Sequence, residues 1–139
     1  CIPSQNKELN ELYKSLNIDY ELFNFTDNLL NYFSKTDFVI TRSGSSMVAE
    51  LLNCNIPFIS VPYPYAADNH QKKNALYFKN KGYSFMVEED KIDSELFPLI
   101  KHIYKDKKIL KKISDKQKSY SDTETFKKIE IELLDLING

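Results

Sequence analysis

The sequence predicts an α/β fold: a Rossmann-like parallel sheet with helices on both faces. Short apolar segments alternate along the chain with segments whose apolar residues recur at helical spacing. Single helices separate the expected strands, which requires parallel crossovers. The chain has 139 residues, of which 42% are hydrophobic. That is enough for one domain of ordinary size, or most of one.

In the first part of the chain, helices and strands are predicted to alternate over residues 7–16, 20–25, 27–33, 37–41 and 46–52. Apolar residues lie at helical spacing in 7–16 and alternate with others in 20–25. Asp27 suits the N-cap of the second helix. The 37–41 segment (DFVIT) lacks polar alternation, so we expect a strand buried on both faces. Gly44 and its serines form the turn that follows.

The second part continues the alternation, with strands over 58–61 and 84–87 and a helix over 70–81. Pro57 and Pro62 flank the first of these strands, and Gly82 suits the C′ position of the helix. From residue 93 the chain is predicted to be helical, with breaks near 106 and 121. The last helix carries apolar Phe126, Ile129, Leu133 and Leu136.

The chain begins with Cys1 and with a helix, whereas a sheet of this kind normally begins with a strand. We therefore expect one truncated domain, 1–139, that lacks its first strand. No basic start with an apolar stretch is visible, so no signal peptide is expected and a reducing cytoplasm is the default.

Composition excludes several classes of protein. The net charge of −1 argues against a general nucleic-acid binder. No window approaches the ~20 apolar residues of a membrane span. Two cysteines are too few for a disulfide scaffold, and Cys54, beside an apolar run, is predicted to be a small buried residue.

The sharpest motif spans residues 41–50 (TRSGSSMVAE), where a strand runs through a small-residue turn into a helix. Gly44 permits positive φ or close approach of a ligand. The free N–H groups of the helix start attract an anion such as phosphate. Glu50 follows Ser46 by four residues, so its carboxylate is placed to accept the hydroxyls of a ribose. The alternative is an N-capped helix with an ordinary salt-bridged glutamate.

A second polar group, at the start of the 70–81 helix, comprises Asp68, Asn69, His70, Gln71 and Asn74. It combines the hydrogen-bond donors and acceptors that sugar recognition requires. A histidine at a helix start can equally have no role, and the sequence assigns no catalytic residue and no metal ligand.

A third feature is the basic run 101–118, which holds eight lysines, two aspartates and interspersed isoleucines. This pattern predicts the solvated face of amphipathic helices. Weak attraction to anionic lipid headgroups is the alternative.

Together these motifs resemble the C-terminal, donor-binding half of the MurG family. These bacterial enzymes transfer N-acetylglucosamine from UDP-GlcNAc to lipid I and so make lipid II for peptidoglycan. The matching segments are 37–44 (DFVITRSG), 48–51 (VAEL), Pro57, 61–64 (VPYP), 68–71 (DNHQ) and Asn74-Ala75. The family has a GT-B architecture, with the donor in the cleft between two Rossmann-like domains.

The resemblance implies a role for each matching position. The backbone at Thr26 reads the uracil edge, and Glu50 binds the ribose hydroxyls. His70 and Gln71 face the N-acetylglucosamine hydroxyls, while Asn74 supports that loop. The remaining members of the expected substrate-binding set are Asn69 at the sugar end and, around the diphosphate, Arg42, Ser43, Gly44, Ser45, Ser46 and Met47.

By the same resemblance, the chain lacks the family's first strand and its Gly-rich loop. It also lacks the N-terminal domain that carries the acceptor site, the membrane-docking patch and the general base. We therefore expect a hexosyltransferase fragment, inactive alone. Its expected partners are UDP-N-acetylglucosamine, lipid I through the missing domain, and the cytoplasmic face of the bacterial inner membrane as a peripheral contact. No nucleic acid and no cofactor are expected.

Other functions fit parts of the pattern. A dolichol-pathway GlcNAc-transferase subunit is similar to a free-standing C-terminal half that needs a partner chain. A non-catalytic nucleotide-sugar-binding module and a flavodoxin-like regulatory domain belong to different functional classes. Binding of UDP and UDP-GlcNAc discriminates the transferase half from a domain that binds neither.

Overall fold

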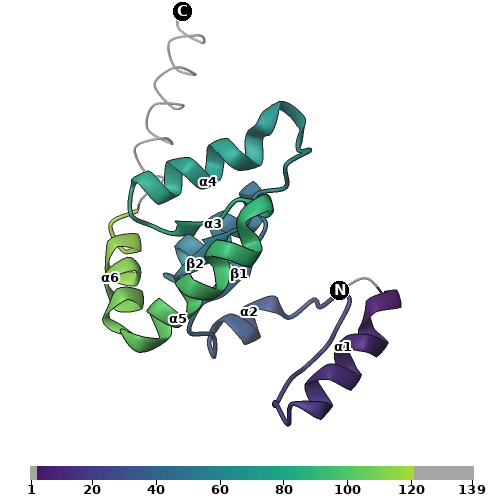
Figure 1. Ribbon diagram of the computed structural model, residues 1–139. Helices are drawn as coiled ribbons and strands as arrows, with labels where there is room; N and C mark the ends of the chain where they lie inside the picture. The colour runs from purple at the N-terminus through teal and green to yellow at the C-terminus, as the bar shows by residue number, and fades with distance from the viewer. Residues whose placement is uncertain (1–2, 121–139) are drawn as a thin grey trace, which may run out of the picture. The chain divides into compact units, whose positions relative to one another are not determined.

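The computed structural model describes residues 3–120. The chain divides into two compact units, residues 1–35 and 36–139. Within its described residues the smaller unit contains helix α1 (Pro3–Ser15) and helix α2 (Leu29–Phe33). The larger unit contains the sheet and the helices packed around it (Figure 1).

In chain order the larger unit contains β1 (Val39–Thr41), α3 (Ser45–Asn53), β2 (Phe58–Ser60), η1 (Ala67–Asn69), α4 (His70–Asn80), β3 (Phe85–Met86), η2 (Glu89–Lys91), η3 (Ile92–Leu96), α5 (Phe97–Lys105) and α6 (Lys108–Gln117). The strands form a parallel sheet in the order β1-β2-β3. Val39 lies opposite Phe58, and Ile59 lies opposite Phe85. A helix links each strand to the next, so the predicted α/β fold with a parallel sheet is confirmed.

Strand β2 forms the centre of the core. All three of its residues are buried, and successive side chains of a strand point to opposite faces. Both faces of the sheet are therefore covered. On one face Ile59 packs with Val87 and with Ile103 of α5, where Leu99, Ile100, Ile109 and Leu110 join them. Helices α3 and α4 bury Val48, Leu51, Leu52 and Ala75.

Three helices end in the same motif, with one residue in the left-handed region. Gly82 follows α4 with φ 77°, Asn55 follows α3 with φ 56°, and Asn17 follows α1 with φ 50°. At each end the next N–H reaches back to the helix, as Tyr83 N does to the Phe78 carbonyl at 2.9 Å. This is the Schellman motif, in which asparagine is the common substitute for glycine. The predicted C′ role of Gly82 is confirmed.

Gln117 joins the ends of α3 and α4. Its side chain is buried, and its Nε2 donates to the carbonyl of Ile56 at 3.0 Å and to that of Tyr83 at 2.8 Å. Each carbonyl belongs to the residue directly after a left-handed C′ position. Helix α6 is thereby tied to the chain just before β2 and β3.

The predicted strand over 20–25 is wrong. The segment contains no strand, and no described strand pairs with it. Tyr20 instead packs on α1, with its ring centroid 5.0 Å from that of Tyr13 and its hydroxyl bonded to Asn10. Alternating side chains do not make a strand without a neighbour to share its hydrogen bonds. The predicted N-cap at Asp27 is also wrong, since Asn28 takes that position.

The strand predicted over 37–41 exists as β1 but is not buried on both faces. Ile40 is 45% exposed, while Val39 and Thr41 are half-buried. Within the described residues β1 is an edge strand, with β2 as its only neighbour. Continuous apolar character predicts burial only when further elements cover the strand.

Cys54 is also exposed, contrary to prediction. It is the C-cap residue of α3, where the chain leaves the core. The break predicted near residue 106 is confirmed between α5 and α6. The break near 121 and the helix with Phe126 lie outside the described residues. Within residues 3–120, no helix combines the length and the apolar character needed to cross a membrane.

Candidate functional site

The candidate site lies at the edge of the sheet where the three parallel strands end. The backbone keeps their exits adjacent: Val61 N donates to the Thr41 carbonyl at 2.8 Å, and Val87 N donates to the Ser60 carbonyl at 3.0 Å. The loops after β1, β2 and β3 therefore begin side by side. In open α/β sheets, ligands bind at this edge.

The loop after β1 leads directly into α3 through Gly44, the N-cap residue. Gly44 has φ −65° and ψ 139°, so of the two roles expected for this glycine positive φ does not apply, and close approach of a ligand remains the prediction. A Cβ built on Gly44 meets no atom within 4 Å, and no side chain caps the helix start. Ser45 and Ser46 are exposed and Met47 is half-buried. The first N–H groups of α3 thus have no side-chain cap, and a helix start of this kind suits an anion.

Glu50 lies one turn further along α3, with its side chain exposed. Within residues 3–120 its carboxylate makes no hydrogen bond or ion pair. The alternative of an ordinary salt-bridged glutamate therefore does not describe Glu50 in the described part of the chain. Both oxygens are free to accept hydrogen bonds from a ligand.

Ser43 and Ser60 are buried polar residues beneath this edge. Both have no exposed surface, and their hydroxyls have no hydrogen-bond partner among the described residues. Ser43 is among the residues predicted to bind the substrate, and its side chain is fully buried. Its burial anchors the turn that leads to Gly44.

The predicted sugar-facing group lies around the start of α4. Asn69 has φ 53°, and His70 Nδ1 lies 2.8 Å from the Ala67 carbonyl. Gln71 Oε1 accepts a hydrogen bond from Tyr63 N at 3.0 Å. Asn69 and His70 are exposed, and Gln71 is half-buried. The Gln71 oxygen is therefore used within the protein, while its amide protons remain available as donors.

Asn74 connects this group to the start of α3. Its Nδ2 donates to Ser45 Oγ at 3.3 Å. The contact joins the first turn of α3 to the second turn of α4. The two motifs that the sequence singled out separately are therefore parts of one site.

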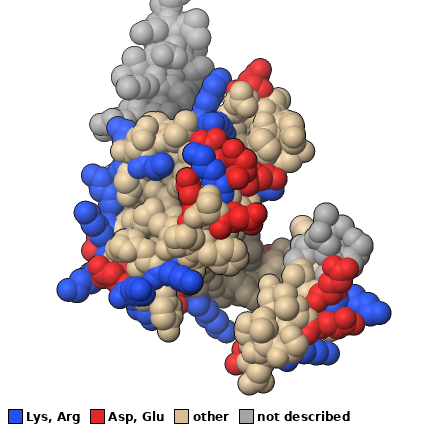
Figure 2. All heavy atoms as spheres, in the orientation of Figure 1, with Lys and Arg blue, Asp and Glu red and all other residues tan. Residues whose placement is uncertain are grey.

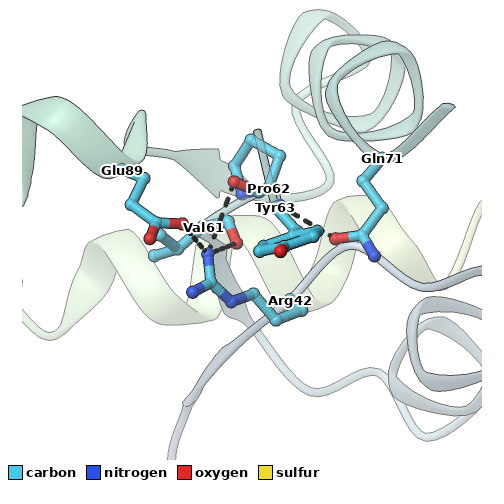
Figure 3. Close-up of polar contacts among 6 residues, drawn as sticks. All are labelled: Arg42, Val61, Pro62, Tyr63, Gln71 and Glu89. Atoms are coloured by element: carbon cyan, nitrogen blue, oxygen red, sulfur yellow. Dashed lines mark hydrogen bonds and ion pairs between the residues drawn. The ribbon is translucent and has the colours of Figure 1, made fainter. Parts of the chain in front are cut away.

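Arg42 is the best-connected side chain of the site (Figure 3). Its Nη1 donates to the carbonyls of Val61 at 3.2 Å and Pro62 at 3.5 Å, and forms an ion pair with Glu89. Its guanidinium carbon lies 5.6 Å from the centre of the Tyr63 ring. Arg42 thus links the loops after all three strands.

The sequence analysis missed the loop after β3. Glu89 pairs with Arg42, and Glu88 pairs with Lys72 of α4 at 2.8 Å. Their position directly after the third strand was the available signal, since it places an acidic run at the ligand-binding edge. The Glu88 carboxylate raises the pKa of Lys72, and the Lys72 ammonium lowers the pKa of Glu88. Both shifts stabilise the charged pair.

These loops surround a pocket of about 470 Å³ in the larger unit. Two of its lining residues, Tyr63 and Tyr65, make an edge-to-face contact, with 5.6 Å between their ring centroids. This volume lies within the ordinary range of small-molecule sites. The lining residues are Pro62, Tyr63, Pro64, Tyr65, Asn69, Lys72, Glu88, Glu89 and Asp90.

Thr26 belongs to the smaller unit. Its Oγ1 accepts a hydrogen bond from Asn28 N at 3.1 Å, and its side chain is half-buried. It lines a pocket of about 870 Å³ within that unit, together with the tilted aromatic pair Phe23 and Tyr32. Flat aromatic surfaces beside polar backbone suit a planar ring, which is compatible with the predicted role of Thr26.

Comparisons with known proteins agree on one family. Residues 2–132 match the model of the glycosyltransferase family 28 C-terminal domain. The Pelagibacter ubique UDP-N-acetylglucosamine--N-acetylmuramyl-(pentapeptide) pyrophosphoryl-undecaprenol N-acetylglucosamine transferase is 36% identical over 131 residues, which are 92% of this chain and 36% of that protein. The Rickettsia bellii protein of the same name is 41% identical over 88 residues, 63% of this chain and 25% of that protein.

Among solved structures, the crystal structure of Acinetobacter baumannii MurG superposes with a TM-score of 0.76 at 21% identity. The match covers 87% of this chain and 37% of that one, and it shows the shared fold. The chain spans between a quarter and about two fifths of the length of these proteins. Because the family model covers nearly the whole sequence, the chain belongs to the glycosyltransferase family 28 C-terminal domain family.

Proposed function

We propose that the chain is the donor-binding part, a single C-terminal domain, of a two-domain GT-B transferase. The enzyme transfers N-acetylglucosamine from UDP-GlcNAc to lipid I and makes lipid II for peptidoglycan. The observation that carries the proposal is the open start of α3 at the end of β1, with the unpaired Glu50 on the same helix. The names of the relatives support the choice of donor and acceptor.

In this proposal the diphosphate binds at the start of α3. The backbone N–H groups of Ser45, Ser46 and Met47 donate to phosphate oxygens, and the two serine hydroxyls add donors. The open space around Gly44 allows the phosphates to approach the backbone. Negative charge grows on the departing UDP as the glycosidic bond breaks, and the positive end of the α3 dipole stabilises that charge.

The other contacts follow from the arrangement of the edge. In the larger unit, Glu50 accepts hydrogen bonds from the ribose hydroxyls. The role of Thr26, whose backbone is proposed to bind the uracil, belongs to the smaller unit and rests on the family resemblance alone. Asn69, His70 and the amide protons of Gln71 face the sugar, while Asn74 holds the two helix starts together through Ser45. No side chain of this set is placed as the general base. In the proposed enzyme the base and the acceptor site come from the other domain, so the isolated chain does not transfer sugar to lipid I.

Calorimetric titration of the 139-residue chain with UDP and with UDP-GlcNAc tests the donor site. We expect both ligands to bind and Glu50→Ala to weaken both about tenfold, because each loses hydrogen bonds to a carboxylate. Glu11→Ala, at an exposed glutamate of α1, is the matched control and should bind as the parent chain does. Failure of the parent chain to bind any uridine nucleotide would contradict the proposal and favour a flavodoxin-like regulatory domain.

We further propose peripheral contact with the cytoplasmic face of the inner membrane through α5 and α6. The eight lysines of residues 101–118 are all exposed and outnumber two aspartates, so this segment carries a net charge of +6 and the rest of the chain −7. Figure 2 shows lysines gathered along one side of the larger unit. Such clusters attract anionic lipid headgroups.

Co-sedimentation with vesicles tests this contact. We expect binding to vesicles that contain phosphatidylglycerol, none to pure phosphatidylcholine, and release by about 0.5 M salt because the attraction is screened. Replacing Lys108, Lys111 and Lys112 by glutamine should weaken binding, whereas Lys7→Gln on α1 should not. Equal binding to both vesicle types, or to neither, would leave the lysines as an ordinary solvated face.

A further inference from the structure

We propose that Arg42 is a positioning residue that holds the loop after β2 in place, and that it is not a ligand of the diphosphate. This inference adds to the proposed donor site. It rests on the proposed function only in taking the pocket after β2 and β3 as part of that site. It revises the role that the sequence indicated, in which Arg42 lies in the diphosphate loop.

The contacts of the Arg42 guanidinium are with the loops after β2 and β3, and within residues 3–120 none is with the start of α3. Its Nη1 reaches the carbonyls of Val61 and Pro62 and the Glu89 carboxylate (Figure 3). Val61 and Pro62 are themselves buried. Moving Nη1 toward a ligand would remove its donors from these carbonyls and from the carboxylate, and unpaired polar groups in partly buried sites are costly.

The charge of Arg42 is also matched within the protein. Glu89 supplies one negative charge in direct contact with the guanidinium, and the side chains of the two residues are 48% and 37% exposed. A guanidinium paired with a carboxylate offers a dianionic diphosphate much less net attraction than a free one. The open start of α3 needs no such side chain, because it already presents N–H donors.

Tyr63 is the residue that these contacts fix. Its ring lies beside the Arg42 guanidinium, and its N–H donates to Gln71 at 3.0 Å. Its ring also meets Tyr65 edge to face. The loop is therefore held from β1 by Arg42 and from α4 by Gln71, and its two tyrosines form one wall of the 470 Å³ pocket.

The loop after β3 supplies the carboxylates that pair with the cations of this site. Consecutive carboxylates bind cations from different elements, Glu89 with Arg42 and Glu88 with Lys72. Within residues 3–120 all three polar contacts of the Arg42 side chain are made through Nη1, and the guanidinium carbon lies over the Tyr63 ring, where lysine has no planar group to place. Arg42 is the only arginine of the chain, whose other 18 basic residues are lysines. Lysine at this position would keep the charge but lose the geometry.

Two measurements on the full 139-residue chain test the inference, beginning with one that needs no ligand. Hydrogen exchange of the Tyr63 amide, followed by NMR, reports how firmly the loop is held. We expect exchange to accelerate about threefold or more in Arg42→Lys, Arg42→Gln and Glu89→Gln. In the double variant Arg42→Gln/Glu89→Gln, the Tyr63 amide should exchange no faster than in Arg42→Gln alone, since both substitutions remove the same ion pair. Lys118→Gln, which breaks an exposed ion pair on α6, is the control.

The second measurement compares affinities for UDP and UDP-GlcNAc. A positioning role predicts that Arg42→Gln and Arg42→Lys both weaken UDP-GlcNAc about tenfold while UDP changes less than about twofold. A diphosphate ligand predicts equal losses for the two nucleotides and recovery of both in Arg42→Lys. That pattern, or unchanged Tyr63 exchange in Glu89→Gln, would overturn the inference. If the parent chain binds neither nucleotide, the donor site is refuted while Tyr63 exchange still decides the role of Arg42.

Discussion

Helices α3 and α4 begin at the same edge of the sheet, but their first turns are built in opposite ways. The start of α3 is open, with extended backbone at Gly44, no side-chain cap and free space around it. The start of α4 also has no side-chain cap, but its first turn is tied to neighbouring segments by contacts of His70, Gln71 and Lys72. An open helix start can bind an anionic group of any shape. A loop held by several hydrogen bonds can select a ligand by its shape.

The ends of the same two helices are alike. Each terminates in a Schellman motif, with Asn55 after α3 and Gly82 after α4, and Gln117 bonds the residue after each. The two helices are therefore held together at their ends and left to differ at their starts. Rigidity at one end and different chemistry at the other are what a binding site on a scaffold requires.

The largest effect is expected from loss of the shared anchor. Gln117→Leu keeps the volume but leaves the carbonyls of Ile56 and Tyr83 buried without their donor. We expect the free energy of unfolding to fall by about 3 kcal/mol, measured by urea denaturation. Lys116→Ala, at the exposed neighbouring position, should change it by less than about 0.5 kcal/mol. A loss of similar size in both variants would show that Gln117 has no special role.

Closing the open helix start should separate stability from binding. Gly44→Asp fits the free space and caps α3, so the free energy of unfolding should rise by a few tenths of a kcal/mol. The same carboxylate repels a diphosphate, and UDP affinity should fall about thirtyfold by calorimetry. Gly44→Ala, which adds no charge, is the control and should keep most of the affinity. Unchanged UDP binding in Gly44→Asp would remove the diphosphate from this helix start.

The two helix ends predict opposite responses to substitution. Gly82 has φ 77°, a conformation that alanine adopts only with strain, so Gly82→Ala should cost about 1 kcal/mol of unfolding free energy. Asn55 has φ 56°, and Asn55→Gly should therefore gain about 0.5 kcal/mol. Thermal or chemical denaturation measures both. Equal and like-signed changes would show that the left-handed conformation does not control these ends.

The smallest effect is expected for the ion pair between Lys72 of α4 and Glu88. The pKa of Glu88 is lowered by Lys72, so the pair contributes stability above the ordinary range of a glutamate and loses it as pH falls through the lowered value. The pKa of Lys72 is raised, so at the alkaline end the contribution is lost only as pH rises through that value. Unfolding followed from about pH 5 to pH 3 should be less acid-dependent in Lys72→Gln. An identical acid profile would show that the pair adds nothing.

Much of the larger unit was predictable because its signals are local. Helix starts and ends depend on residues within about five positions of one another, as at Gly82, and the apolar segment of β2 is buried as its sequence indicates. The sequence also singled out the starts of α3 and α4 as polar segments that we expect to face a ligand. The fold then placed them at one edge, linked by Asn74 and Ser45.

The failures share one physical cause, which is that burial and pairing depend on distant neighbours. The 20–25 segment alternates like a strand but has no strand beside it, and Cys54 follows apolar residues but lies at an exposed helix end. The local sequence pattern determines neither whether another strand lies beside a segment nor whether a helix end faces the solvent.

The alternation of apolar segments with helical patterns was enough to predict the α/β architecture, and Gly82 was enough to predict the end of α4. The role of Arg42 required the folded chain, because its partner Glu89 lies 47 residues away. Parallel crossovers between Arg42 and Glu89 bring the chain back to the same edge of the sheet, which is why the two residues meet. The residues around Arg42 in the sequence suggest an anion as its partner, whereas the folded chain pairs it with Glu89 of η2, which follows β3.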